Sequence, residues 1–137
     1  MQLDEIFNDS LERVQGTDSH AFYGQFYKKF IAQSPEIKAK FTDADMHRQE
    51  KMLHASLLYM MNLFSSRAID EPLEHIATLH NAKKLNIEPR FYDIWLDTLV
   101  DTVKEFDPKF NDKIELAWRV VLAGGVAFMK FRYSKSL

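Results

Sequence analysis

The chain has 137 residues and a formal net charge of −2, which fits one domain and gives no electrostatic argument for a nucleic-acid partner. Hydrophobic residues make up 46% and charged residues 28%, which excludes a disordered chain. With 0 cysteines, disulfides, thiol catalysis, iron–sulfur clusters and C-x-x-C-H cofactor attachment are excluded, and a reducing, cytoplasmic setting is expected. No membrane-spanning segment or signal-peptide pattern is present, so we expect no membrane partner.

Apolar residues in the first part of the chain recur at helical spacing. A first helix is predicted from Leu3 to Val14, ending near Gly16. Thr17 or Asp18 can cap a second, aromatic helix whose stripe is Phe22, Tyr23, Phe26, Tyr27, Phe30 and Ile31. Ser34 followed by Pro35 predicts a short third helix, after which Phe41 leads into an acidic loop.

The remainder of the chain predicts four longer helices. Thr42 or Asp43 is expected to cap a long helix with the apolar face Met46, Gln49, Leu53, Ser56, Leu57, Met60, Met61 and Phe64. Asp70 is expected to cap a helix carrying Leu73, Ile76 and His80, and Pro89 to open a helix carrying Phe91, Tyr92, Trp95, Leu99 and Val103. The last helix begins near Asn111 or Asp112. The fold class is therefore all-α, with six substantial helices and one short helix in a single domain spanning 1–137.

Two compositional features hint at a packed interior around something bulky. Aromatic residues make up 13% of the chain, so either the core is unusually bulky or it surrounds something large and flat. Gly124 and Gly125 lie inside the last helix, where each costs about 1 kcal/mol relative to alanine. Close approach of another helix or of a ligand explains them better than a tolerated flaw.

Histidine is the remaining candidate for chemistry, because the common catalytic and metal-binding motifs are absent. His20, His47, His54 and His75 have ordinary surface or edge positions, although His54 adjoins the apolar face of the long helix. His80 lies on an apolar stripe, one turn after Ile76. Such a histidine is more often a satisfied core residue than a ligand, but an axial imidazole for haem iron needs this kind of position, and a porphyrin needs a large apolar slot.

Three patterns in the chain occur in the order and spacing found in bacterial globins. They are Phe26-Tyr27-x-x-Phe30 followed by Ser34-Pro35-Glu36-Ile37 and Phe41; then His80-x-x-x-x-Leu85-x-Ile87-x-Pro89-x-x-Tyr92-x-x-Trp95; and finally Ala117-Trp118 through Phe128-Met129 to Tyr133. Over nearly its whole length the chain resembles single-domain bacterial haemoglobins and the globin part of flavohaemoglobins. The resemblance implies a globin fold around one non-covalent haem b.

The resemblance also implies roles for individual residues. His80 matches the proximal iron ligand, and Tyr27 and Gln49, with Leu53 one turn later, match the polar distal side. Tyr27 has an alternative role as a core tyrosine bonded to backbone, and Gln49 as an edge residue that reaches solvent. The implied cofactor-binding residues are Phe41, Leu53, Leu57, His80, Lys84, Ile87, Tyr92 and Trp95. For Lys84, together with Lys83, the plainer interpretation is that it complements a helix dipole.

One position departs from the family pattern. Where those globins carry a glutamate on the last helix that supports the proximal histidine, this chain has Tyr133. The proximal histidine is then expected to donate to backbone, which weakens any claim of strongly electron-donating chemistry. Tyr27, Gln49 or His54 as a sixth iron ligand remains an alternative.

The expected function is reversible binding of dioxygen or another diatomic ligand, such as nitric oxide or carbon monoxide. Whether the protein is also an enzyme stays open: the alternatives are a nitric oxide dioxygenase working with a separate reductase, and a haem-based gas or redox sensor. A globin-shaped protein without haem is a further alternative, which His80 and the aromatic slot oppose.

Overall fold

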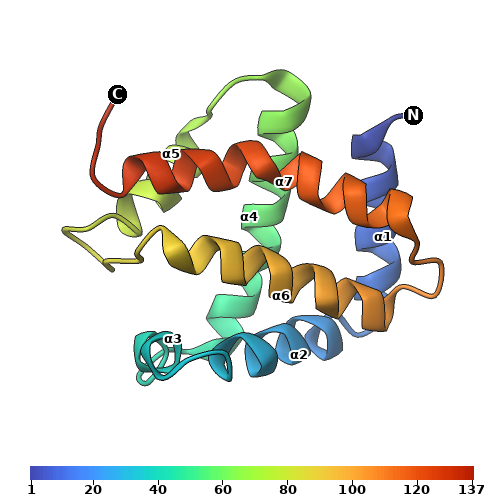
Figure 1. The fold of residues 1–137 in the computed structure, drawn as a ribbon, viewed down its shortest axis with the longest axis horizontal. Coiled ribbons are helices and arrows are strands. Elements are labelled where there is room, and N and C mark those ends of the chain that lie inside the picture. Colours follow the sequence, from blue (N-terminus) through green and yellow to red (C-terminus); the bar gives the residue numbers. More distant parts are fainter.

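The computed structural model describes residues 1–137 as seven helices and no strands (Figure 1). This confirms the all-α prediction. The helices are α1 (Leu3–Gln15), α2 (Ser19–Ile31), α3 (Pro35–Lys40), α4 (Met46–Ser66), α5 (Glu71–Leu79), α6 (Arg90–Phe106) and α7 (Asp112–Arg132). No helix combines the length and the hydrophobicity that crossing a membrane requires.

The helix starts largely follow the polar residues that the sequence offers as caps. Side-chain oxygens of Ser34, Asp70 and Asn111 accept hydrogen bonds from the backbone N–H three residues later, at 3.1, 3.1 and 2.9 Å. For α4, the prediction of Thr42 or Asp43 is wrong. A turn closed by the hydrogen bond from the Ala44 N–H to the Phe41 carbonyl takes up these residues, so the helix begins later. Asp45 is the cap instead, because its side chain accepts from the Arg48 N–H.

The end of α5 also differs from the prediction. The helix stops at Leu79, and His80 follows as its C-cap, although its N–H still donates to the Ile76 carbonyl at 3.1 Å. Lys83 and Lys84 lie in the turn beyond, where their N–H groups donate to the Asn81 side chain, so they do not end a helix as expected. His80 therefore keeps its place one turn after Ile76, at the point where the helix gives way to a loop.

The first and last helices are joined by a buried polar network. Trp118 in α7 is fully buried, packs against Phe7 at 4.5 Å between ring centroids, and donates its indole N–H to the Ser10 hydroxyl at 2.9 Å. Ser10 in turn donates to Asp107 at 2.7 Å, and Arg13 forms two further bonds to that carboxylate. Burial alone would raise the pKa of Asp107, but hydrogen bonds from Arg13, Ser10 and the Lys109 N–H lower it overall.

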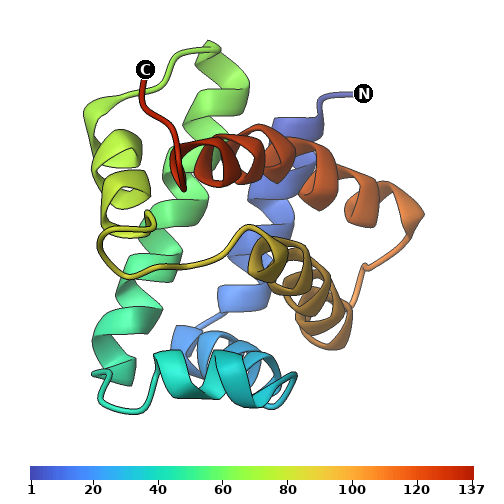
Figure 2. The same ribbon diagram turned by 60° about the vertical axis from the view of Figure 1, so that its left-hand side comes forward.

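The crossing of α4 and α7 brings two backbones close together (Figures 1 and 2). A β-carbon built on Gly125 would lie 2.3 Å from Cγ of Met60, whereas one on Gly124 would meet only Leu63, at 3.7 Å. The expectation that a neighbouring helix explains the glycine pair is thus confirmed for Gly125, since any larger residue there would collide with α4. Met60 also lines the cavity described next, so this crossing forms part of the cavity wall.

Candidate haem pocket

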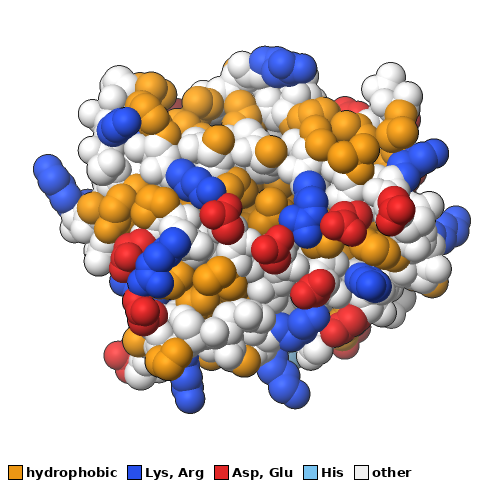
Figure 3. All heavy atoms as spheres, in the orientation of Figure 1, with side chains coloured by type: hydrophobic (Ala, Val, Ile, Leu, Met, Phe, Trp, Pro, Cys, Tyr) orange, Lys and Arg blue, Asp and Glu red, His pale blue; other side chains and the backbone are white.

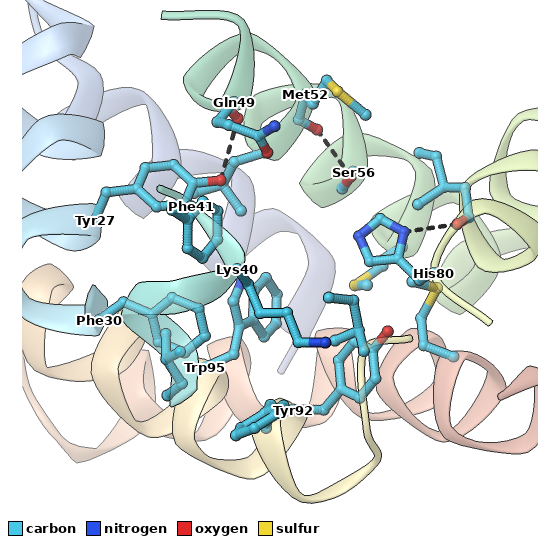
Figure 4. Close-up of a pocket in the computed structure, with 17 residues that line it drawn as sticks. Tyr27, Phe30, Lys40, Phe41, Gln49, Met52, Ser56, His80, Tyr92 and Trp95 are labelled. Atoms are coloured by element: carbon cyan, nitrogen blue, oxygen red, sulfur yellow. Dashed lines mark hydrogen bonds between the residues drawn. The ribbon is translucent and has the colours of Figure 1, made fainter. Parts of the chain in front are cut away.

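A largely apolar cavity lies between α2, α3, α4, α5 and α6, with one contribution from α7. The space between its walls, including the open solvent at its mouth, is about 850 Å³. Thirteen of its seventeen lining residues are hydrophobic. They are Tyr27, Phe30, Ile37, Lys40, Phe41, Gln49, Met52, Leu53, Ser56, Met60, Ile76, His80, Ile87, Phe91, Tyr92, Trp95 and Met129 (Figure 4).

His80 presents one ring nitrogen to this cavity. Its Nδ1 lies 2.8 Å from the Ile76 carbonyl oxygen, and because a carbonyl can only accept, Nδ1 carries the hydrogen. Burial lowers the pKa of His80, against the raising effect of that backbone bond, so the ring is neutral near pH 7. The Nε2 lone pair is then unprotonated and faces the cavity (Figure 4), which is the form of histidine that binds metals.

Tyr27 and Gln49 lie across the cavity from His80 (Figure 4). The Tyr27 hydroxyl donates to the backbone carbonyl of Gln49 at 3.1 Å, which corresponds to the alternative role considered for this tyrosine. The Tyr27 ring packs edge-on against Phe41, with ring centroids 5.5 Å apart. Burial raises the pKa of Tyr27, and Glu50 and Tyr23 add to the effect, so the phenol stays protonated and can donate.

Tyr92 carries the one buried side-chain polar atom without a hydrogen-bond partner. Its hydroxyl lies at the cavity below His80 (Figure 4), and burial raises the pKa of Tyr92. An unpaired buried hydroxyl is uncommon, because leaving such a group unsatisfied costs about 1–3 kcal/mol. The cavity thus combines apolar walls, one imidazole nitrogen free to bind a metal and one orphaned hydroxyl. This set of groups fits an iron porphyrin.

The structure brings most of the predicted site residues together. Eight of them line the cavity: Tyr27, Phe41, Gln49, Leu53, His80, Ile87, Tyr92 and Trp95. Leu57 and Lys84 are not among the lining residues. Leu57 is fully buried in the general core, one turn beyond Leu53, and Lys84 is exposed on the turn after α5.

Sequence reasoning missed several lining residues. Ser56 and Met60 stood on the predicted apolar face of the long helix together with Gln49, so their helical spacing was a usable signal. Lys40 precedes Phe41 in a short helix, and no periodicity marks it as a cavity residue.

His54 points away from the cavity. Its Nδ1 lies 2.9 Å from the Tyr23 hydroxyl, in a separate cluster that includes His20, His47 and Glu50. This placement contradicts the idea that His54 binds iron from the opposite side, because α4 turns that face toward α2. In the same cluster His20 forms hydrogen bonds to the Glu50 carboxylate at 2.8 and 3.0 Å.

Tyr133 supports the loop after His80 without touching the histidine. Its hydroxyl donates to the Asn86 side chain at 2.5 Å, and its backbone carbonyl accepts from Ala82 N–H at 2.9 Å. His80 donates to backbone, as the sequence predicted from the missing glutamate.

The fold and this cavity define a class of protein: all-helical, with one neutral and partly buried imidazole that faces an apolar pocket. The globin family model matches residues 24–129. The chain belongs to the globin family.

A solved structure from Pseudomonas aeruginosa PAO1 shares this fold. That protein, described as structurally highly homologous to human haemoglobin, is 31% identical to this chain, with a TM-score of 0.87. The match covers 98% of this chain and 100% of that one. No curated protein matches the chain.

Proposed function

We propose that this globin binds one haem b non-covalently, with His80 as the axial ligand, and that it reversibly binds dioxygen or another diatomic gas. The observation that carries the proposal is the orientation of His80: its Nδ1–H is held by the Ile76 carbonyl, and its free Nε2 faces an apolar cavity. A haem iron, when bound, supplies a position at which a diatomic gas can bind reversibly.

The protein groups around that position would control water and hydrogen bonding. Phe41 and Leu53 line the cavity on the side of Tyr27 and Gln49 and limit the access of water. The donors on this side are the Gln49 amide and the Tyr27 hydroxyl, whose proton must first leave the Gln49 carbonyl to reach a ligand. In a dry pocket each bond to a partly negative ligand is strengthened, so both donors are expected to slow its release.

Absorption spectra of the purified chain mixed with haemin test this function. We expect a strong Soret band in the ferric, ferrous and carbonmonoxy forms, and its loss or clear shift in His80→Ala. Exposed His75→Ala on α5 is the matched control. His80→Gly with added imidazole should recover the ferrous and carbonmonoxy spectra, which separates a lost ligand from a misfolded chain. No specific haemin uptake by the wild type would refute the proposal.

A binding role is favoured over nitric oxide dioxygenation with a separate reductase. The His80 ring donates to a neutral carbonyl and not to a carboxylate, and a carboxylate partner is what makes an axial imidazole more basic. With dioxygen and a separate reductase supplied, we expect nitric oxide to be consumed only slowly compared with the exchange of bound dioxygen.

A further inference from the structure

Lys40, the last residue of α3, is the only charged residue that lines the cavity. Its side chain extends across the opening toward Tyr92 (Figure 4). The ammonium group donates to the backbone carbonyl of Asn86 at 2.9 Å and lies 3.5 Å from that of Leu85. Lys40 thus joins α3 to the turn that follows His80, at the edge of the apolar pocket.

The charge of Lys40 is not balanced by any carboxylate within 4 Å. Arg90, in contrast, pairs with both Glu36 and Glu88. A cation whose partners are neutral carbonyls gains from exchanging them for an anionic oxygen, because charge-assisted hydrogen bonds between two ions are the stronger kind. The mouth of the cavity therefore holds a positive charge available to an anionic group of a ligand.

We propose that Lys40 binds a carboxylate at the edge of a porphyrin, exchanging the carbonyls of Leu85 and Asn86 for it. This rests on the proposed function, because the ligand is the propionate edge of the same porphyrin. Lys40 takes the role that the sequence suggested for Lys84, which is exposed outside the cavity. Binding of the carboxylate by Lys40 would break the hydrogen bonds that join α3 to the turn after His80. Porphyrin binding would therefore be coupled to the release of this turn.

Metal-free protoporphyrin IX separates this contact from the iron–histidine bond. Its fluorescence change on binding is measured for the diacid and for the dimethyl ester, which has the same ring but no carboxylate. We expect Lys40→Gln to weaken binding of the diacid about three- to fivefold, the upper part of the range of a solvent-facing ion pair, and to leave ester binding unchanged. Lys40→Arg should retain most of the affinity, and Lys84→Gln is the matched control.

The results also distinguish this inference from the function on which it rests. Three results would overturn the role of Lys40. Lys40→Gln weakens binding of the diacid and of the ester equally, it weakens neither, or the wild type binds neither porphyrin. Haemin uptake that depends on His80 together with any of these outcomes leaves the proposed function intact. A further outcome is that Lys40→Gln weakens binding of the diacid only, while the haemin spectrum does not depend on His80. This result would support the contact between Lys40 and the carboxylate and would refute His80 as the iron ligand.

Discussion

Gly125 and Met60 touch where α7 crosses α4, so closely that a β-carbon on Gly125 would lie 2.3 Å from Cγ of Met60. We predict that Gly125→Ala lowers the free energy of unfolding by about 1–3 kcal/mol, the usual cost of overpacking a helix contact. Gly124→Ala, one residue away, should instead raise it by up to about 1 kcal/mol, because helix propensity improves and only Leu63 is nearby. Urea unfolding of both variants measures the contrast, and equal effects would contradict the assignment of the contact to Gly125.

Tyr92 offers a second test in the protein without haem. Removing its unpaired buried hydroxyl should remove a cost, so Tyr92→Phe is expected to raise the free energy of unfolding by about 1 kcal/mol. Urea unfolding of the haem-free chain measures this directly. A loss of stability would mean that the hydroxyl has a partner, such as an ordered water molecule, and that the orphaned group is not part of an unfilled ligand site.

His20 should make stability depend on pH. The hydrogen bond and the charge of Glu50 raise the pKa of the exposed His20 above its usual 6.5, so the folded state binds the proton more tightly than the unfolded state. Its contribution is fully present below pH 6.5 and is lost as the pH rises through the folded-state pKa. The melting temperature of His20→Gln should therefore fall below that of the wild type at pH 5.5, and the difference should shrink by pH 8.5. A difference in melting temperature that is the same at both pH values would contradict this role of His20.

Tyr27 tests the distal side of the pocket. If its hydroxyl leaves the Gln49 carbonyl and donates to bound dioxygen, Tyr27→Phe should speed dioxygen release about fivefold, which corresponds to one hydrogen bond of about 1 kcal/mol. Stopped-flow displacement of dioxygen by carbon monoxide in the haem-loaded protein measures the rate. An unchanged rate would indicate that the hydroxyl keeps its bond to the backbone when the protein is loaded.

The helical spacing of apolar residues predicted the helices and their buried faces, because one face of each helix must be buried. Spacing put Leu53 and Trp95 on the buried faces of their helices, and the resemblance to bacterial globins assigned them to the pocket that they line. The sequence distance from Ile76 placed His80 one helical turn further on. Spacing predicted Leu57 as buried but could not tell that it packs in the general core, because neighbouring turns of a buried helix face can meet different partners. Spacing gave no signal for Lys40 and left the direction of His54 open, because the direction of a long or polar side chain at an element edge depends on tertiary contacts.

The serine in the network between α1 and α7 has a directional role. Ser10 uses its single proton for Asp107 and its lone pair for Trp118, so it lies between a group that only accepts and a group that only donates. Loss of the Ser10 hydroxyl leaves the buried Trp118 N–H without its partner, and loss of the Asp107 carboxylate leaves the Ser10 proton without its acceptor. Residues near the two ends of the chain are therefore coupled through Ser10, and the stability effects of substitutions at these positions are not additive.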